Sequence, residues 1–238
     1  MSTAEQRLQM AKNIIDFEAR RDGKGHLAVY NLPSNDGGGR YEVAGINERY
    51  DGPAVRKLVA LLGQHRYDEA EEYAQEYIAQ NTDSAATLTN IPMIESYLRD
   101  CVFNRGGRGT IKILQLALHV GVDGYMGPKT KAAMAEAEKN PKLLLKKLRD
   151  AREEYERDYV GYRSNFWHGL VNRWNKAEEV ALNYPDSAPM TLAAAIDSSS
   201  GARAMTGQVD LDQYGGYTGV ATNFSSGGLV GRPPAKDE

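Results

Sequence analysis

Residues 3–18 read TAEQRLQMAKNIIDFE, and this stretch predicts the amphipathic helix that anchors the fold. A stripe of residues at helical spacing makes up its predicted buried face: Leu8, Ala11, Ile15 and Glu18. Thr3, with Gln6 three positions later, has the pattern of a capping box, so the helix should begin at Ala4. We expect it to reach Arg20 and to carry Glu18 near its C-terminal end.

The position of Glu18 suggests a chemical role. A carboxylate near the C-terminal end of a helix meets the negative end of the helix dipole, and partial burial also disfavours its charged form. Both effects should raise the pKa of Glu18 above the ordinary value of a glutamate. A carboxyl group that keeps its proton near neutral pH can act as a general acid, so Glu18 is the first candidate for a catalytic residue.

A small β-hairpin is predicted to follow this helix. Residues 26–30 are apolar and β-prone, and residues 33–39, PSNDGGG, form a dense turn signal. Residues 40–46 then alternate, with even- and odd-numbered side chains on opposite faces. The hairpin brings two further carboxyl groups, Asp36 and Glu42, close in sequence to the first helix.

Helical periodicity dominates the rest of the folded region. Further helices are predicted over residues 53–62, 67–79, 93–103, 110–118, 128–139, 141–162 and 166–183. In the longest of these helices, five residues are predicted to point inward: Leu144, Leu145, Leu148, Tyr155 and Tyr159. Five charged residues are predicted to point outward: Lys146, Arg149, Arg152, Glu153 and Glu156. The expected fold class is mainly α, of the α+β kind.

The composition of the chain changes near Pro185. Residues 185–238 are rich in Ser, Gly, Ala and Thr and have little periodicity, so we expect a flexible tail without a core of its own. The preceding residues should form two lobes. Residues 1–92 would hold the first helix and the hairpin, and residues 93–184 would form a helical lobe packed on them.

Composition excludes several classes of protein. No apolar run reaches the roughly 18 residues of a membrane-spanning helix, and the first residues lack the apolar segment of a secretory signal. With 29 basic and 32 acidic residues the net charge is −3, which argues against a dedicated nucleic-acid binder. Four scattered histidines and a single cysteine give no support to a metal site, and no cofactor is expected.

Three segments carry a resemblance to a known family. Residues 100–118 (DCVFNRGGRGTIKILQLAL) and 122–130 (VDGYMGPKT) closely resemble glycoside hydrolase family 108, and residues 166–173 (FWHGLVNR) are similar to its closing motif. Residues 36–46 look like the family's D-P-G-G-x-T-x-x-G-I hairpin. Two departures stand out: the family's E-G-G-Y run becomes Glu18-Ala-Arg-Arg, and its hairpin threonine falls on Glu42. The resemblance covers about residues 10–180.

The resemblance implies a lysozyme-like fold and N-acetylmuramidase activity on bacterial peptidoglycan. Glu18 would then protonate the glycosidic oxygen, and Asp36 or Glu42 would place the water or stabilise the cationic centre. A separation of the two carboxyl groups of about 6.5–9.5 Å predicts inversion, and one of about 5–5.5 Å predicts retention. The sequence leaves this choice open. The candidate substrate contacts are Tyr41, Asn104, Asp123 and Trp167.

Each of these residue types also has an ordinary structural role. Asp36 in an Asn-Asp-Gly sequence is more often a turn former, and Glu42 fits a solvated strand position. Asn104 fits a buried polar group beside a turn, and Asp123 followed by glycine fits a turn by its backbone chemistry. Trp167 at helical spacing is more often part of a core.

Three functions therefore remain open at the level of sequence. The first is a muramidase that hydrolyses the MurNAc-β-1,4-GlcNAc bond. The second is a non-catalytic virion or injection-apparatus protein that keeps a lysozyme-like, peptidoglycan-binding fold. The third is a lytic transglycosylase, which would leave a 1,6-anhydro end.

The way in which the protein reaches the cell wall follows from the same features. Without a signal sequence, we expect it to reside in a virion or in the host cytoplasm before release and to act in the periplasm or cell wall. The Gly/Ser-rich tail would dock on virion or secretion-machinery proteins. A virion-associated enzyme is preferred to a free endolysin, because an acidic protein is not attracted to an anionic wall.

Overall fold

The first helix begins as its sequence predicts. The computed structural model describes residues 2–32, 39–160 and 167–184. Helix α1 (Ala4–Glu18) starts at a full capping box, in which the Thr3 side chain accepts a hydrogen bond from the Gln6 amide and the Gln6 side chain accepts one from the Thr3 amide. The helix ends at Glu18, two residues before the expected end.

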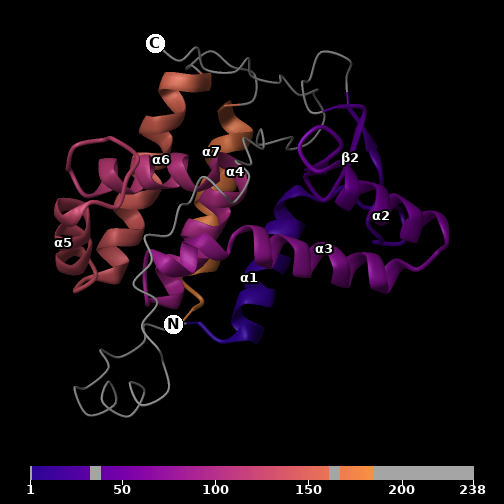
Figure 1. Ribbon diagram of the computed structural model, residues 1–238, viewed down its shortest axis with the longest axis horizontal. Helices are drawn as coiled ribbons and strands as arrows, with labels where there is room; N and C mark the ends of the chain where they lie inside the picture. Colours follow the sequence, from indigo (N-terminus) through magenta and orange to yellow (C-terminus); the bar gives the residue numbers. More distant parts are fainter. Residues whose placement is uncertain (1, 33–38, 161–166, 185–238) are drawn as a thin grey trace.

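The predicted stripe on α1 is partly wrong. Leu8 is 37% exposed, whereas the buried residues occupy two sides of the helix: Met10, Ala11, Ile14, Ile15, Phe17 and Glu18. The reason lies in the surroundings of the helix, because it packs between two hydrophobic clusters instead of covering a single one. Figure 1 shows α1 in the middle of the molecule, with α3 and β2 on one side and α4 on the other.

The predicted hairpin is present within a three-stranded antiparallel sheet. Strands β1 (Tyr30–Asn31), β2 (Tyr41–Val43) and β3 (Ile46–Asn47) lie in the order β1-β2-β3. Ala44 and Gly45 both have positive φ, at 52° and 76°, which is the backbone of a two-residue type I′ turn. The first strand overlaps the predicted residues 26–30 only at Tyr30, and residue 27 forms only an isolated bridge with residue 21. The prediction of residues 40–46 as one alternating strand was wrong, because the positive φ of Ala44 and Gly45 reverses the chain between β2 and β3.

The remaining described helices match the predicted positions closely. They are α2 (Gly52–Gly63), α3 (Tyr67–Asn81), α4 (Pro92–Ala117), α5 (Pro128–Ala137), α6 (Pro141–Val160) and α7 (Trp167–Ala181), with a short 3₁₀ helix over Asp83–Thr87. In Figure 1, α2, α3 and the sheet form one end of the molecule, and α5 and α6 form the other. No helix within the described residues is both long and apolar enough to cross a membrane.

Helix α4 joins two segments that the sequence predicts as separate helices. The helical path is interrupted at Gly106, where φ is 66° and ψ is 174°. This backbone conformation is accessible essentially to glycine alone. The Thr110 hydroxyl donates to the Gly106 carbonyl oxygen over 2.8 Å, which gives that carbonyl a partner at the kink. The conformation of Gly106 is therefore the point at which the regular path of α4 is broken.

Two hydrophobic clusters form the core. The larger one joins α4, α5, α6 and α7 with Met10 and Phe17 of α1. The other joins α1, the sheet, α2 and α3 with Phe103 of α4. Both α1 and α4 therefore contribute to both clusters. The mainly helical α+β class expected from the sequence is confirmed by this arrangement.

Helix α6 departs from its predicted orientation at two charged residues. Leu144, Leu145 and Leu148 are buried as predicted. Arg152 and Glu156, predicted to face solvent, are also buried, at 0% and 1% exposure. The prediction was wrong because it assigned charged residues to the outside, whereas each of these two has an oppositely charged partner on another helix. The predicted inward side chain of Tyr159 lies outside the described residues, as does the tail over 185–238.

Candidate active site

Glu18 occupies a buried place at the junction of α1, the sheet and α4. It is the last residue of α1 and is 5% exposed. The β2–β3 turn lies directly against it: a Cβ on Gly45 would stand 3.4 Å from Glu18 Cβ and 3.0 Å from Phe103 Cε1. A glycine with positive φ is needed there, because any larger residue would press on Phe103. The hairpin thus packs against the carboxyl-bearing end of the helix.

Arg173 of α7 binds Glu18 from the other side. Its Nη1 donates to Oε1 of Glu18, and its Nη2 donates to Oδ1 of Asp100 over 2.6 Å. Asp100, on α4, accepts a second ion pair at Oδ2 from Nη1 of Arg152, on α6, over 2.5 Å. We call Glu18, Arg173, Asp100 and Arg152 the buried ion network. Their side chains are at most 2% exposed.

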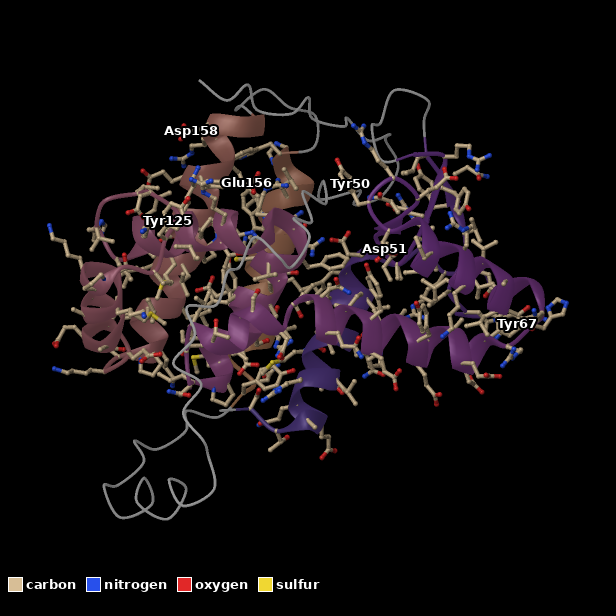
Figure 2. All side chains as sticks on the ribbon, in the orientation of Figure 1. Tyr50, Asp51, Tyr67, Tyr125, Glu156 and Asp158 are labelled. Carbon is tan, nitrogen blue, oxygen red and sulfur yellow. The ribbon has the colours of Figure 1, made fainter. Side chains whose placement is uncertain are left out.

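A second ion pair lies beside this network. Arg105, just before the kink of α4, donates through Nη2 to Oε2 of Glu156 over 2.5 Å, and its Nε also binds that carboxylate. Glu156 stands one helical turn after Arg152 on α6. Figure 2 shows Glu156 where α6 and α7 run close together. The Arg105–Glu156 pair and the buried ion network therefore both lie in the part of the molecule formed by α4, α6 and α7.

Burial and charge pull the pKa of Glu18 in opposite directions. Removal from water raises the pKa of this carboxyl above its ordinary value, Arg173 lowers it, and Asp100 raises it again. The net result is a raised pKa. Burial also acts to raise the pKa of Asp100, but Arg173 and Arg152 together outweigh burial, so its pKa is lowered. The pKa values of the two carboxyl groups therefore shift in opposite directions: Asp100 stays ionised, and Glu18 favours its protonated form.

The hydrogen bonds of Glu18 agree with this assignment. Oε1 accepts from Arg173, whereas Oε2 is buried and has no hydrogen-bond partner among the described residues. A buried charged oxygen without a partner is unfavourable, and a protonated oxygen is less so. Oε2 is therefore the atom suited to carry a proton.

The two other candidate carboxyl groups have different outcomes. Asp36 lies outside the described residues. Glu42 is on β2, opposite Asn47 of β3, in the same hairpin whose turn packs against Glu18. It is 2% exposed, so the interpretation of Glu42 as a solvated strand residue is wrong. The alternation of strand residues predicts two faces, but here both faces of this short strand are covered.

The candidate substrate contacts are dispersed over the molecule. Tyr41 is half-buried on β2, with the Arg40 guanidinium 5.8 Å from its ring centroid. Trp167, at the start of α7, is half-buried and packs edge-on against Trp174, with 5.6 Å between ring centroids. Asn104 is buried, and its Nδ2 donates to the backbone oxygen of Asp100 over 2.8 Å. Asn104 therefore holds the helix segment that carries Asp100.

Asp123 serves the loop between α4 and α5. Its Oδ1 accepts from Gln115 Nε2 over 2.6 Å and from the Tyr125 amide over 2.9 Å. Gln115 in turn accepts the amides of Asp123 and Gly124 and also donates to the Tyr125 carbonyl. These bonds give Asp123 the turn-forming role that its sequence context favours.

Sequence reasoning missed the partners of Glu18. Arg173 ends the segment 166–173, which was singled out for its resemblance and was given no role. Arg152 follows Leu148 by four positions and therefore lies on the same inward stripe of α6. Its position on that stripe indicates burial, but its charge led to the prediction that it faces solvent.

Comparison with known proteins supports the fold. No protein-family model matches the chain, and no curated protein matches it. Among solved structures, the chain is similar to the structure of Brucella abortus SagA, with a TM-score of 0.53 and 18% sequence identity. The match covers 76% of this chain and 97% of that chain. At this level of identity the likeness is one of fold.

Proposed function

We propose that this protein is a lysozyme-like glycoside hydrolase that cleaves the MurNAc-β-1,4-GlcNAc bond of peptidoglycan, with Glu18 as general acid. The observation that carries the proposal is the setting of Glu18: a buried carboxyl of raised pKa at the end of a helix, against the turn of a small hairpin. Glycosidic cleavage needs such an acid, because the leaving oxygen must be protonated. The resemblance of residues 100–130 and 166–173 to glycoside hydrolase family 108 supports the same activity.

Different residues would carry out the two parts of this reaction. Arg173 holds Oε1 of Glu18, so Oε2 would carry the proton that passes to the glycosidic oxygen. The bond to the sugar then breaks and leaves a cationic centre at the anomeric carbon. Glu42, in the hairpin that packs against Glu18, is the described carboxylate that would stabilise this centre or orient water, and Asp36 is the alternative.

A specific observation favours a second candidate, a non-catalytic protein that binds peptidoglycan. The charges of the buried ion network are matched in number, and Glu18 itself is paired with Arg173. Such a network can serve to define the packing of α1, α4, α6 and α7 without any turnover. The replacement of E-G-G-Y by Glu18-Ala-Arg-Arg agrees with this candidate.

The biological setting is also part of the proposal. We place the protein in a phage, as a virion component or a lysis enzyme, with the periplasm or cell wall as its site of action. Residues 185–238 would bind virion or secretion-machinery proteins. This setting is supported by the polar, Gly/Ser-rich composition of those residues and by the acidic net charge.

The decisive experiment measures muropeptide release from purified sacculi. Glu18→Gln removes the transferable proton and keeps the shape of the side chain. We expect it to lower the rate at least about 100-fold, the usual contribution of a general acid. The matched control is Glu5→Gln, which changes an exposed glutamate of the same helix and should leave the rate unchanged.

The outcomes separate the candidates. Full activity of folded Glu18→Gln would contradict the role of Glu18. Wild-type protein that sediments with sacculi and releases nothing would favour the non-catalytic candidate. Mass spectrometry of the released fragments distinguishes hydrolysis from transglycosylation, since only the latter leaves a 1,6-anhydro end.

A further inference from the structure

Asp100 has an unusual position in the buried ion network, because it binds two arginines from two different helices. Its Oδ1 accepts from Arg173 of α7 over 2.6 Å, and its Oδ2 accepts from Arg152 of α6 over 2.5 Å. Arg173 is shared in its turn between Asp100 and Glu18. The geometry is a linear chain of alternating charges with Glu18 at one end and Arg152 at the other.

This row of alternating charges bears on whether Glu18 can keep its proton. An arginine paired with a buried glutamate favours the ionised carboxylate, and an ionised carboxylate has no proton to give. If Arg173 had Glu18 as its only partner, its full charge would act on that carboxyl. Asp100 offsets this charge at short range, and it remains ionised while buried because Arg173 first and Arg152 second lower its pKa.

We propose that Asp100, backed by Arg152, is a positioning residue that holds Arg173 on one oxygen of Glu18 and offsets its charge, so that Glu18 remains an acid. The inference rests on the proposed role of Glu18 as general acid. Asp100 does not touch the reacting atoms in this scheme and acts through Arg173.

The charged groups around Glu18 come from three helices. Arg173 comes from α7, Asp100 from α4 and Arg152 from α6, and within the described residues these are the charged groups with the main effects on the pKa of Glu18. The β2–β3 turn presents Gly45 to it and therefore no charge at its point of contact. Phe103 packs against the same turn, and the ring of Phe17 stands 5.8 Å from the Arg173 guanidinium carbon. With Glu18 protonated, Arg173, Asp100 and Arg152 together carry a net charge of +1.

This arrangement predicts opposite effects for the two positioning residues. Asp100→Asn raises the net charge of these three groups from +1 to +2, so the Glu18 carboxyl should ionise at lower pH. Arg152→Gln lowers it to zero while Arg173 still holds Asp100 ionised, so Glu18 should ionise at higher pH. The double variant Asp100→Asn/Arg152→Gln restores the original balance. A role in packing alone predicts no such reversal of sign.

The test is a direct titration of Glu18 by carbon-13 NMR of labelled glutamate carboxyl groups, with the Glu18 signal assigned by its loss in Glu18→Gln. We expect the midpoint to move down by at least one pH unit in Asp100→Asn, a tenfold change in the dissociation constant. It should move up in Arg152→Gln and return at least halfway in the double variant. Asp150→Asn, an exposed change on α6, is the control and should leave the midpoint in place.

The alkaline limb of the muropeptide-release profile should follow the same order among the variants. Midpoints that stay together in folded Asp100→Asn and Arg152→Gln, or that move in the same direction, would overturn the inference. If Asp100→Asn does not fold, Arg152→Gln and the double variant still give the sign. Midpoints that move as expected in a protein without activity would support the positioning role and overturn the proposed hydrolase instead.

Discussion

At the scale of single residues, the protein places a carboxyl group where water cannot stabilise its charge. Glu18 has a side chain that is 2% exposed, one oxygen bound by Arg173 and one oxygen that no described residue binds. Burial outweighs the arginine, and the pKa is raised. A residue of this kind lowers the stability of the folded protein whenever it is ionised. The raised pKa of Glu18 therefore affects the free energy of unfolding, and this effect can be measured without substrate.

The first such prediction concerns stability as a function of pH. A carboxyl with a pKa raised on folding stabilises the native state below its unfolded pKa, and this contribution is lost as pH rises through the folded value. Glu18→Gln cannot ionise. The free energy of unfolding of wild type, relative to Glu18→Gln, should therefore fall as pH rises above about 4.5, by about 1.4 kcal/mol for each unit by which the pKa is raised.

Denaturant unfolding of both proteins between about pH 4 and 8 measures this difference. Glu5→Gln serves again as the control, since its side chain is exposed and its difference from wild type should stay flat. A constant gap between wild type and Glu18→Gln over the whole range would show that Glu18 has an ordinary acidity in the folded protein.

At the scale of elements, two backbone conformations position the network. The type I′ turn at Ala44–Gly45 lets the hairpin reach Glu18 and Phe103. The interruption at Gly106 divides α4 into the part that carries Asp100 and the part that ends at Ala117. Both are places where a residue with a Cβ is strained. The chain therefore has strict local requirements at these two positions.

The hairpin turn gives a direct test at this scale. Gly45→Ala adds a Cβ at positive φ, 3.0 Å from Phe103 Cε1, a contact that forces the turn to shift. We expect a loss of about 1–3 kcal/mol in the free energy of unfolding. We also expect lower muropeptide release, because the turn forms one wall around Glu18.

The matched control is Gly63→Ala at the end of α2. Nothing lies within 4 Å of the added Cβ, and the backbone there has no positive φ. Alanine is favoured over glycine in a helix, so stability should stay the same or rise by up to about 1 kcal/mol. Equal effects of the two substitutions would contradict the role assigned to the turn.

At the scale of the whole molecule, two hydrophobic clusters share two helices. Helix α1 gives Met10 and Phe17 to one cluster and Ile14 and Ile15 to the other. Helix α4 runs mainly in the first cluster but inserts Phe103 into the second. Because the same rigid elements belong to both, loosening one cluster should loosen the other. The described part of the protein should therefore unfold cooperatively.

Phe103→Ala tests this cooperativity. Truncation of a buried phenylalanine should lower the free energy of unfolding by about 3–5 kcal/mol. Both tryptophans of the chain, Trp167 and Trp174, lie on α7, on the side of the first cluster. Their fluorescence transition should shift as far as the circular-dichroism transition. A tryptophan transition that stays at the wild-type position would show two independently folding lobes.

Much of this architecture could be predicted from local pattern. The capping box at Thr3 and the prolines at the starts of α2, α5 and α6 each act within a few residues. The predicted helices therefore match the observed ones within a few positions. In α6 the errors occurred where a charged residue was buried, at Arg152 and Glu156, because periodicity records polarity and contains no information on partners.

The sequence by itself determined where most of the helices lie and that Glu18 stands near the end of an amphipathic helix. Those features depend on hydrogen bonds and torsions between residues a few positions apart. Only the tertiary structure decided that Glu18 meets Arg173, 155 positions away, and that Asp100 binds Arg152 and Arg173, 52 and 73 positions away. Such pairs are stable only in an interior that excludes water, and that interior exists only once α1, α4, α6 and α7 have packed together.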